Sequence, residues 1–438
     1  MIQTDYAAEY LDQPDLGDAY DVIVIGGGPA GATAAALVAA AGHSVLVLER
    51  ESVPRFHVGE SLIPETYWTL ERLGLIKKLQ DSAFPKKYSV QFVSDGHRYS
   101  APFYFHTHKP DSPSVQSWQV ERGEFDKMLL DNAIEHGATL RTDTQVLDLV
   151  WEGRPGESRA TGVKIRLKSD DDGPRTISSK VVVDASGQSA FIAKRLGLYE
   201  ADDRLKKGTV WTYWKGAKRD EGIDEGCTII MQTEGKQSWF WYIPLQDDVV
   251  SVGCTRDMGD MFPKGVSAEE AYQRELARCP ALQERLEGAE NLTGYHATKD
   301  FSYYSSKPAG DGWVLCGDAY GFIDPVYSTG VFCALKSGEF AADAVIEALE
   351  QNRCDAATLG AWAPRYKEGT ELFRKLVYAF YAPDFNFADF FREHPQYRAN
   401  MTDILIGDVF KPGVGEIFEA MGEVIPPTSR ERSAAVAV

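Results

Sequence analysis

Apolar residues gather in two short, uninterrupted runs near the start of the chain. The first is DVIVI at 21–25 and the second is SVLVLE at 44–49, with an alanine-rich segment at 30–41 that stops at Gly42. Uninterrupted runs of this length are typical of strands buried on both faces, whereas the longer alanine-rich segment is typical of a helix. The pattern therefore predicts a strand, a helix and a second strand, which together form a right-handed βαβ unit.

Beyond residue 50 the pattern predicts a mixture of helices and strands. We expect a helix at 64–80 and then β-rich runs at 89–94, 97–105 and 114–120, whose alternation is typical of an antiparallel sheet. The later segments are expected in this order: a helix at 123–136, a strand at 139–150, a strand at 180–187, a β-rich block from Gly208 to Thr255, helices to about 290, a strand at 312–319, a helix from Val331 to Glu350 and further helices to about 410.

The loop between the first strand and its helix has the sequence GGGPAG, in which Gly26, Gly28 and Gly31 have the spacing GxGxxG. In this motif the first glycine permits a tight turn, the second lets the backbone approach a pyrophosphate and the third lets the helix pack on the strand. The N-terminus of the helix then faces the phosphates with its unpaired N–H groups. Glu49 ends the second strand, where a carboxylate accepts the ribose hydroxyls. A purely structural glycine turn is the alternative, but the surrounding βαβ pattern favours nucleotide binding.

A second nucleotide signal lies late in the chain, where the strand-like GWVLC at 312–316 delivers Gly317 and Asp318 to a helix start. Many flavoproteins use a Gly-Asp pair in this place to contact the ribityl chain of FAD, so the pair favours FAD over NAD. A helix N-cap is the alternative role of the aspartate. Because no second GxGxxG motif is present for a nicotinamide cofactor, we expect the reducing equivalents to come from elsewhere.

Together these segments predict a mixed α/β (α+β) fold with a discontinuous nucleotide-binding domain. A Rossmann-type FAD-binding domain is expected from residues 18–82, 121–200 and 300–350. A substrate domain with an antiparallel β-sheet is inserted as residues 83–120 and 201–299, and a helical C-terminal cap follows at 351–438.

Composition narrows the class of protein. At 438 residues, with 44% hydrophobic and 25% charged residues, the chain has the make-up of a globular protein of two or three domains. It has no run of about 18 apolar residues and no secretory signal pattern at its start, so we expect no membrane span and a cytoplasmic location. The net charge of -19 disfavours nucleic acid as a partner, and six cysteines without a CxxC pair argue against a zinc site.

Four stretches make the sequence resemble the flavin-dependent halogenases. They are SWFWYIP at 238–244, which contains the WxWxIP pattern of that family, FHVGESLIP at 56–64, KYSVQF with Lys87 at its head, and FIDPVYSTG at 322–330, which matches FxxPxxSxG. The resemblance covers about residues 20 to 335 and is greater to the phenol and pyrrole halogenases than to the tryptophan halogenases. Tryptophan halogenases have a glutamate where this chain has Tyr327, a difference that suits a phenolic substrate and puts indole in doubt.

The resemblance implies a reaction and a set of reactants. Reduced FAD, supplied by a separate flavin reductase, would react with O2 to a C4a-hydroperoxide, and chloride or bromide would attack it to give hypohalous acid. That acid would travel through a tunnel to Lys87, which would donate a hydrogen bond to it or form a haloamine, with desolvation tuning the lysine pKa. The substrate would be a small electron-rich aromatic such as a phenol or pyrrole, free or bound to a carrier protein.

The resemblance and the motifs also assign residues. Lys87 is the expected catalytic residue, with a solvated strand-end lysine as the alternative, and Lys86 beside it leaves the register open by one. Backbone N–H groups of Thr329 and Gly330 are expected to bind the halide. The expected FAD contacts are Gly26, Gly28, Ala30, Gly31, Glu49, Arg50, Ser61, Arg122, Gly317, Asp318 and Gly330. The expected tunnel and substrate residues are Trp239, Trp241, Pro244, Pro325, Tyr327 and Ser328.

Several alternatives stay open at this point. Trp239 and Trp241 could serve packing, as alternate aromatics on opposite faces of a sheet, and Arg122 could form a surface salt bridge. Aromatic hydroxylases and geranylgeranyl-reductase-like oxidoreductases share the glycine loop and the Gly-Asp pair, but they lack the combination of WxWxIP and Lys87. A catalytically inactive FAD-binding protein is the remaining alternative.

Overall fold

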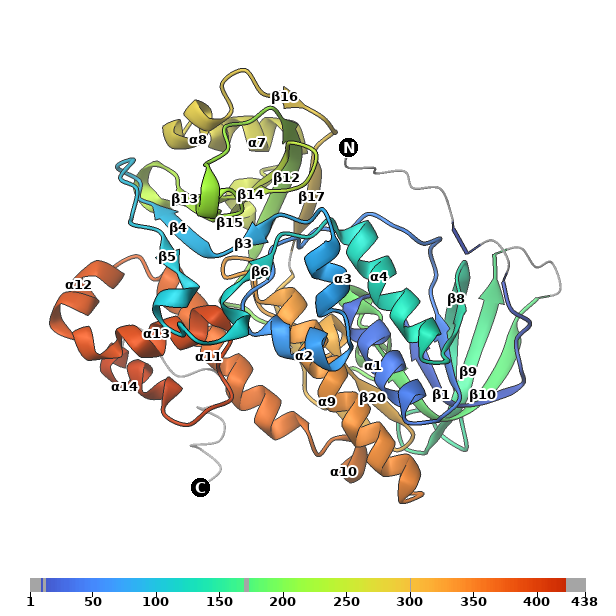
Figure 1. Cartoon of the computed structure of the whole chain (residues 1–438). Helices are drawn as coiled ribbons and strands as arrows, with labels where there is room; N and C mark the ends of the chain where they lie inside the picture. Colours follow the sequence, from blue (N-terminus) through green and yellow to red (C-terminus); the bar gives the residue numbers. More distant parts are fainter. Residues whose placement is uncertain (1–8, 11–12, 169–172, 300, 423–438) are drawn as a thin grey trace. The chain divides into compact units, whose positions relative to one another are not determined.

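The computed structural model describes residues 9–10, 13–168, 173–299 and 301–422. The chain divides into two compact units, Met1–Ala363 and Pro364–Val438. The first unit contains the predicted βαβ start and two large sheets (Figure 1). Within the described residues no helix is long and apolar enough to cross a membrane, and no group of three or more His, Cys, Asp or Glu side chains is arranged to hold a metal ion.

The first sheet has a parallel centre in the order β7-β2-β1-β10-β20. Its apolar strand β1 is central, and Val22, Ile23 and Val24 are fully buried because the sheet is covered on both faces. The strands β19 and β9 extend it in antiparallel fashion from β20 and β10, and β8 pairs with β9. The strands of this sheet are β1 (Ala19–Ile25), β2 (Val45–Leu48), β7 (Thr139–Arg141), β8 (Thr144–Trp151), β9 (Ala160–Leu167), β10 (Arg175–Asp184), β19 (Ala309–Gly310) and β20 (Trp313–Leu315).

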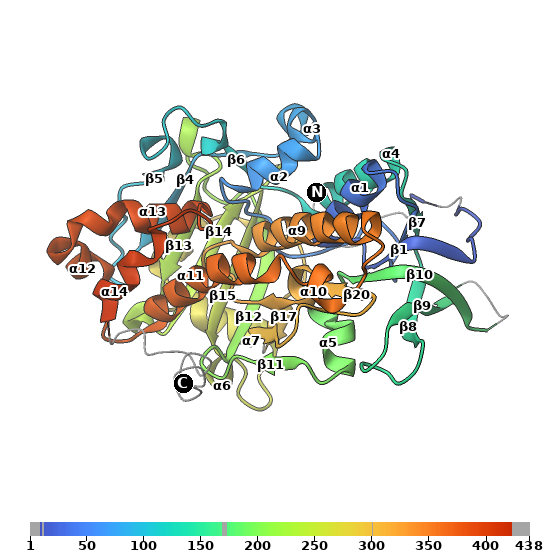
Figure 2. The same ribbon diagram turned by 90° about the horizontal axis from the view of Figure 1, so that it is seen from below.

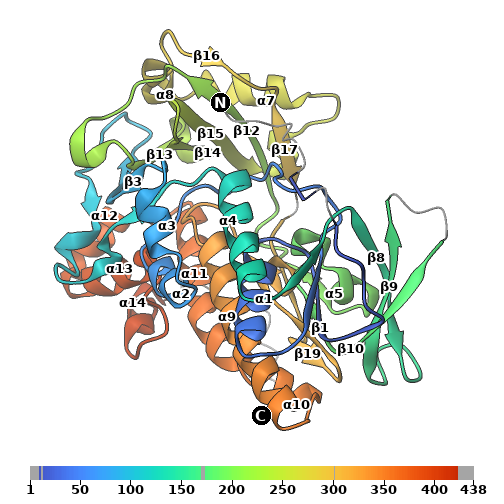
Figure 3. The same cartoon turned by 45° about the vertical axis from the view of Figure 1, so that its right-hand side comes forward.

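Helix α1 (Pro29–Ala40) packs against both α4 (Arg122–Glu135) and α9 (Gly330–Glu350), and Figure 3 shows it between them. It begins with a proline in its first turn and ends before Gly42, whose φ of 90° is typical of a residue that follows a helix C-terminus. Figure 2 shows α1 and α9 side by side. Gly338 permits their close approach, because any larger residue there would place its Cβ 2.5 Å from the carbonyl oxygen of Ala30.

The second sheet has the order β16-β12-β15-β14-β13-β4-β5, with β17 also paired to β12. Helices α7 and α8 pack on one of its faces, where Tyr272 and Leu282 join Phe240 and Tyr242 of β14 in an apolar core (Figure 1). Its elements are β4 (Ser89–Val93), β5 (Phe103–Tyr104), β12 (Lys207–Lys215), β13 (Thr228–Gln232), β14 (Ser238–Pro244), β15 (Val249–Asp257), β16 (Glu290–Asn291), β17 (His296–Lys299), α6 (Met258–Met261), α7 (Ala268–Leu276) and α8 (Pro280–Arg285).

Shorter elements complete the first unit. A two-stranded ribbon pairs β3 with β6, and a three-stranded sheet joins β11, β18 and β21. The remaining elements are α2 (Thr66–Arg72), α3 (Ile76–Asp81), β3 (Lys86–Lys87), β6 (Ser117–Trp118), α5 (Phe191–Arg195), β11 (Tyr199–Ala201), β18 (Tyr303–Ser305), β21 (Gly321–Phe322) and α10 (Ala356–Leu359).

The second unit is helical. Within it a Cβ at Gly369 would lie 2.4 Å from the Phe410 ring, so glycine permits a close helix-to-loop contact. Phe385, Phe387, Phe390 and Phe391 form a chain of ring contacts. Its helices are α11 (Ala363–Tyr381), α12 (Phe387–Glu393), α13 (Arg398–Ile406) and α14 (Ile417–Met421). The mixed α/β fold and the helical C-terminal region are confirmed, whereas the predicted domain boundaries and a capping role for 351–438 stay predictions.

The structure differs from the local predictions at three places. The helix expected at 64–80 is split into α2 and α3, because Gly74 adopts a φ of 73° that ends the first helix. The second sheet is antiparallel as predicted except at one pairing, where β4 lies parallel to β13. Trp239 and Trp241 do not lie on opposite faces, because residues two apart on a strand point to the same face.

Candidate functional site

A cavity of about 910 Å³ lies in the first unit and is lined by residues of both sheets. Its floor is formed at the carboxyl ends of β1, β2 and β10, by Gly26, Glu49 and Ala185. Open parallel sheets bind ligands at this edge, and a cavity of this volume accommodates a ligand as large as a dinucleotide. The opposite wall includes Trp211 of β12 and Trp241 of β14.

The glycine loop has the geometry that a pyrophosphate site needs. A Cβ at Gly26, whose φ is 101°, would lie 2.5 Å from the Ala185 carbonyl oxygen, and a Cβ at Gly31 would lie 2.0 Å from the Gly26 carbonyl oxygen. These two glycines therefore allow the loop to fold. Gly28 differs, because among the described residues a Cβ there would have just one atom within 4 Å, Nη2 of Arg55 at 3.7 Å. Gly28 caps α1 without a side-chain hydrogen bond, so the first-turn N–H groups face the cavity unshielded by a side chain.

A buried ionic network supports this loop. The Glu49 carboxylate accepts hydrogen bonds from the Gly27 N–H at 2.9 Å and from Arg55 at 3.1 Å. Arg55 also pairs with Asp126 at 3.0 Å, and Arg122 pairs with the same aspartate at 2.8 Å. Arg122 is therefore part of a buried network, and the surface salt bridge considered from the sequence is wrong. Arg55 and Arg122 balance the negative charges of Glu49 and Asp126. The network therefore fixes Glu49 at the end of β2 without leaving an unpaired buried charge.

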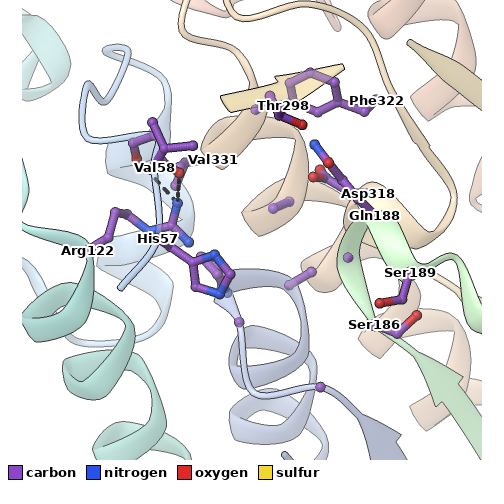
Figure 4. A pocket seen from close by; sticks show the side chains of 18 of the residues that line it. His57, Val58, Arg122, Ser186, Gln188, Ser189, Thr298, Asp318, Phe322 and Val331 are labelled. Atoms are coloured by element: carbon purple, nitrogen blue, oxygen red, sulfur yellow. Dashed lines mark hydrogen bonds between the residues drawn. The ribbon is translucent and has the colours of Figure 1, made fainter. Parts of the chain in front are cut away.

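Side chains around the middle of the cavity have shifted pKa values. Figure 4 shows His57 and Arg122 on one side of the pocket, and Asp318 with Ser186 and Ser189 on the other. Desolvation inside the cavity, reinforced by the neighbouring Arg55 and Arg122, lowers the pKa of His57, although its side chain is exposed on the cavity surface. Burial raises the pKa of Asp318 to about 7, although Arg122 opposes that shift.

An aromatic wall closes the side of the cavity next to the second sheet. His296 stacks on Phe56 at 4.7 Å and on Trp211 at 5.4 Å between ring centroids. Beneath this wall the Tyr213 hydroxyl donates a hydrogen bond to the Glu60 carboxylate at 2.7 Å, and burial raises the pKa of Glu60. The wall is apolar apart from the imidazole, as expected for a site that receives a flat ring system.

The two tryptophans of the WxWxIP stretch lie on the same face of β14, with ring centroids 6.1 Å apart. Trp241 lines the cavity and donates a hydrogen bond to Ser251 at 3.1 Å, whereas Trp239 is buried behind it. Trp241 lies flat across β15 because that strand has Gly253, where a Cβ would lie 2.1 Å from the indole ring. One tryptophan thus contributes to the cavity wall and the other to its support.

Lys87 is fully buried at the head of the ribbon β3–β6, where it lies opposite Ser117. Its ammonium donates to the hydroxyl of Ser61 at 2.8 Å and to the carbonyl oxygen of Leu62 at 3.2 Å, and the Phe105 ring lies 5.7 Å away. Burial lowers the pKa of Lys87 to about 7. Ser61 lines the cavity, so a single hydroxyl separates the lysine from it. Lys86, by contrast, is exposed.

The shifted pKa of Lys87 has a consequence for stability. Between pH 7 and pH 10 the unfolded chain holds a proton on this lysine that the folded chain lacks, so the lysine's unfavourable contribution to folding shrinks as the pH rises. Lys87→Met should therefore be more stable than the wild type at pH 7, and its advantage should fall by about 1.4 kcal/mol per pH unit towards pH 10. Urea unfolding at several pH values measures this difference, with Lys86→Met as the control. A constant difference would contradict the burial of an ionisable amine at 87.

The turn before α9 brings a further backbone site to the cavity. Pro325, Ser328 and Gly330 line the cavity, and Ser328 has a φ of 56°. Thr329 is the N-cap residue of α9, a helix of 21 residues, and its side chain accepts no hydrogen bond from the helix backbone. The first N–H groups of α9 therefore have no acceptor from the N-cap side chain. Such a turn-and-helix start binds anions without a charged side chain.

The structure brings many of the sequence-predicted residues to this one cavity. Those that line it are Gly26, Gly28, Ala30, Glu49, Arg50, Ser61, Arg122, Trp241, Asp318, Pro325, Ser328 and Gly330. Those that are not among its lining residues are Gly31, Lys87, Trp239, Pro244, Gly317, Tyr327 and Thr329. Gly317 packs on α1, since a Cβ there would lie 2.7 Å from that of Ala30.

Sequence reasoning missed several cavity residues. Arg55, His57 and Glu60 lie within or beside the FHVGESLIP stretch, whose histidine and glutamate were an available signal. Trp211 and His296 carry no such signal, because they come from separate strands and meet only when β12 pairs with β17.

The chain is similar to known proteins in both sequence and structure. A family model described as an FAD binding domain matches residues 19–331. The chain is 29% identical to a 1H-pyrrole-2-carbonyl-(peptidyl-carrier protein) chlorinase of Pseudomonas fluorescens, over 93% of each chain. It is 31% identical to the corresponding brominase of Pseudoalteromonas luteoviolacea, over 76% of this chain and 79% of that one. The solved structure of the flavin-dependent brominase Bmp2 matches with a TM-score of 0.80 and 28% identity, over 92% of this chain and 98% of that chain.

Proposed function

We propose, because the chain belongs to the flavin-dependent halogenases, that it installs chlorine or bromine on an electron-rich aromatic such as a phenol or pyrrole. FAD is its cofactor, and we expect a separate flavin reductase to deliver it as FADH2. The observation that carries the proposal is the buried Lys87, one hydroxyl away from the cavity that contains the predicted FAD-binding residues.

The reaction balances with the reactants that this proposal names. When bound in its reduced form, FAD supplies the two electrons with which dioxygen and a proton convert halide into hypohalous acid and water. Transfer of the halogen to an aromatic C–H then forms the carbon–halogen bond and a second water. The protein must hold the cofactor, keep the oxidant away from bulk water and present it to the substrate.

The chain's own groups suit these tasks. The uncapped start of α1 and Glu49 are suited to hold the pyrophosphate and the ribose of FAD. The N–H groups of Thr329 and Gly330 are suited to hold the halide, since the turn at Ser328 leads into the uncapped start of α9. Trp241 and the aromatic wall around His296 exclude water from the intervening space.

Lys87 is the group suited to handle the oxidant. With a pKa of about 7, it is present both as an ammonium and as a neutral amine at neutral pH. The ammonium donates a hydrogen bond that polarises hypohalous acid, and the amine has a lone pair that can take the halogen as a haloamine. Because the side chain is buried, either species is protected from competing nucleophiles in solution.

The names of two relatives refine the substrate. Both act on a pyrrole-2-carbonyl group bound to a peptidyl carrier protein, and one of them matches almost the full length of this chain. Tyr327 in the turn, where tryptophan halogenases have a glutamate, also supports a phenol or pyrrole over an indole. We therefore extend the proposal to an aromatic acyl group presented on a carrier protein.

The substrate proposal is tested with FAD, a flavin reductase, NADH, O2 and either chloride or bromide. Pyrrole-2-carboxylic acid and 4-hydroxybenzoic acid are offered free and as thioesters on a carrier protein. We expect halogenated product by mass spectrometry from at least one of the aromatics, with the thioester at least ten times faster than the free acid. Equal rates would remove the carrier protein from the proposal, and a halogenated indole as the preferred product would contradict the substrate class.

A further inference from the structure

A chain of hydrogen bonds runs from Lys87 into the second sheet through buried side chains. The Lys87 ammonium donates to Ser61 Oγ at 2.8 Å, and Ser61 Oγ lies 2.9 Å from Thr228 Oγ1. The Gln119 amide nitrogen donates to Thr228 Oγ1 at 2.8 Å and to the carbonyl oxygen of Gly226 at 2.8 Å. All the side chains of the chain are at most 4% exposed, so water does not compete for these bonds.

The chemistry of the donors fixes the direction of these bonds. The Gly226 carbonyl only accepts, so the side-chain group of Gln119 that faces it must be the NH2 group, and the same group donates to Thr228. Thr228 accepts from Gln119 and is only 1% exposed, so we assign its own hydrogen to Ser61, the nearby hydroxyl that can accept it. Ser61 accepts from Thr228 and from Lys87, which leaves its hydroxyl hydrogen for a partner in the cavity that Ser61 lines.

The backbone holds this chain in place. A Cβ at Gly226 would lie 2.2 Å from the carbonyl oxygen of Lys86, so glycine lets the segment before β13 pack directly on β3. The carbonyl oxygen of Leu62, the second acceptor of Lys87, also accepts from the hydroxyl of Ser117 at 3.0 Å. The lysine head is thus held between two fixed acceptors, and only one of them reaches the cavity.

Within the described residues, Lys87 forms no ion pair with a carboxylate. Burial raises the pKa of the neighbouring Cys227 to about 11, so this thiol is neutral at pH 7. The Asp224 carboxylate accepts hydrogen bonds from Ser89 and Tyr104, and the Glu60 carboxylate accepts one from Tyr213. A proton that leaves the lysine therefore has Ser61 as its acceptor.

We propose that Ser61 carries a proton between Lys87 and the cavity, and that Thr228 and Gln119 are positioning residues that orient its hydroxyl. This inference rests on the proposed halogenase function and on haloamine formation. It assigns to Ser61 a role in proton transfer, beyond the FAD contact expected from the sequence.

The proton balance shows where the relay acts. When the ammonium reacts with hypohalous acid, one N–H proton joins the departing hydroxide to form water, and the nitrogen electron pair forms the N–halogen bond. A second N–H proton must also leave, and it passes to Ser61 Oγ while the hydroxyl hydrogen of Ser61 moves to an acceptor in the cavity. The halogen keeps its oxidation state throughout. When the neutral amine reacts, only one N–H proton leaves, and it joins the departing hydroxide to form water. No second proton has to be passed on, so no relay is needed.

The test therefore compares two pH values. In Ser61→Ala, halogenation should fall several-fold, and at most about tenfold, at pH 6, where most of Lys87 is an ammonium, and should change little at pH 9, where it is an amine. Ser61→Thr keeps the hydroxyl and should restore the wild-type pH profile. Ser117→Ala removes a hydroxyl that bonds the same Leu62 carbonyl without facing the cavity, and its profile should match that of the wild type.

A second readout is independent of activity. The 13Cε resonance of Lys87, assigned by its loss in Lys87→Met, reports the lysine pKa in the protein without halide or oxygen. Ser61→Ala should lower this pKa, because the ammonium loses one of its two acceptors, whereas Ser61→Thr should leave it in place. FAD affinity is measured in parallel so that any loss of cofactor is accounted for.

The outcomes separate the relay from the function on which it rests. A wild type that forms no halogenated product overturns both. A wild type that halogenates, together with a Ser61→Ala variant that keeps the wild-type profile, overturns only the relay. A loss in Ser61→Ala that is equal at pH 6 and pH 9, with an unchanged Lys87 resonance, shows a structural role and also overturns the relay.

Discussion

Lys87→Ala is expected to lower the rate of aromatic halogenation about a thousand-fold while FADH2 oxidation by O2 continues at the wild-type rate. The reason is spatial, because Lys87 is buried behind Ser61 and does not line the cavity that contains the predicted FAD-binding residues. Removing it should leave cofactor binding and halide oxidation intact and delete only the group that we propose handles the oxidant. Hypohalous acid should then escape, and free methionine in the buffer should be converted to its sulfoxide.

Two further variants decide what the lysine contributes. Lys87→Met removes the amine but fills most of the space, so its activity should match that of the alanine variant. Lys87→Arg keeps a positive charge but cannot lose a proton, so it should restore activity only if hydrogen bonding to hypohalous acid is sufficient. Product mass, flavin absorbance and methionine oxidation are followed in the same reactions. Halogenation by Lys87→Met at the wild-type rate would remove Lys87 from the mechanism.

The second large effect is expected from two alanine substitutions in the glycine loop, of which one should weaken FAD binding and the other should lower the stability of the apoprotein. Gly28→Ala should weaken FAD binding at least about 100-fold, because its methyl group occupies the approach of the pyrophosphate. The apoprotein should lose only about 1 kcal/mol, since Gly28 has an extended backbone and open space around its Cβ position. Gly31→Ala should instead destabilise the apoprotein by about 3 kcal/mol or more, because its methyl group would lie 2.0 Å from a backbone oxygen.

FAD titration by fluorescence quenching and urea unfolding of the apoprotein measure these two effects separately. Each variant serves as the control for the other, because both add one methyl group and the two positions are three residues apart. If Gly28→Ala bound FAD as tightly as the wild type, the pyrophosphate would not lie over the start of α1. If Gly31→Ala were as stable as the wild type, the close contact between helix and strand would not exist as described.

Local sequence was sufficient where short-range rules decide the structure. The strand, glycine loop, helix and strand of 19–48 follow from uninterrupted apolar runs and from Gly42, and all four are present within a residue or two of their expected bounds. The split at Gly74 shows the limit of periodicity, because the apolar spacing continues through a position where the backbone turns. The parallel pairing of β4 with β13 joins residues about 140 positions apart, and no local pattern encodes it.

The site divides in the same way. Motifs located Gly28, Glu49, Arg122, Asp318 and Lys87, because each lies in a stretch whose residue types have a chemical reason. They did not indicate that Arg55 and Arg122 share Asp126, or that His296 stacks between Phe56 and Trp211. Those contacts arise from tertiary packing; the two arginines add to the desolvation that lowers the pKa of His57, and the stacked rings shape the wall. The halide site at Thr329 and Gly330 and the catalytic role of Lys87 remain predictions for experiment.

The most direct test of the central claim is the mass of the product that the wild-type protein forms from a phenol able to undergo either halogenation or hydroxylation. The reaction contains FAD, a flavin reductase, NADH, O2 and bromide, with the phenol supplied free and as a carrier-protein thioester. The account predicts a product in which one hydrogen is replaced by bromine, with its paired isotope peaks, and none when bromide and other halides are omitted. A product that gains only oxygen, with or without bromide, would contradict the account and identify a hydroxylase.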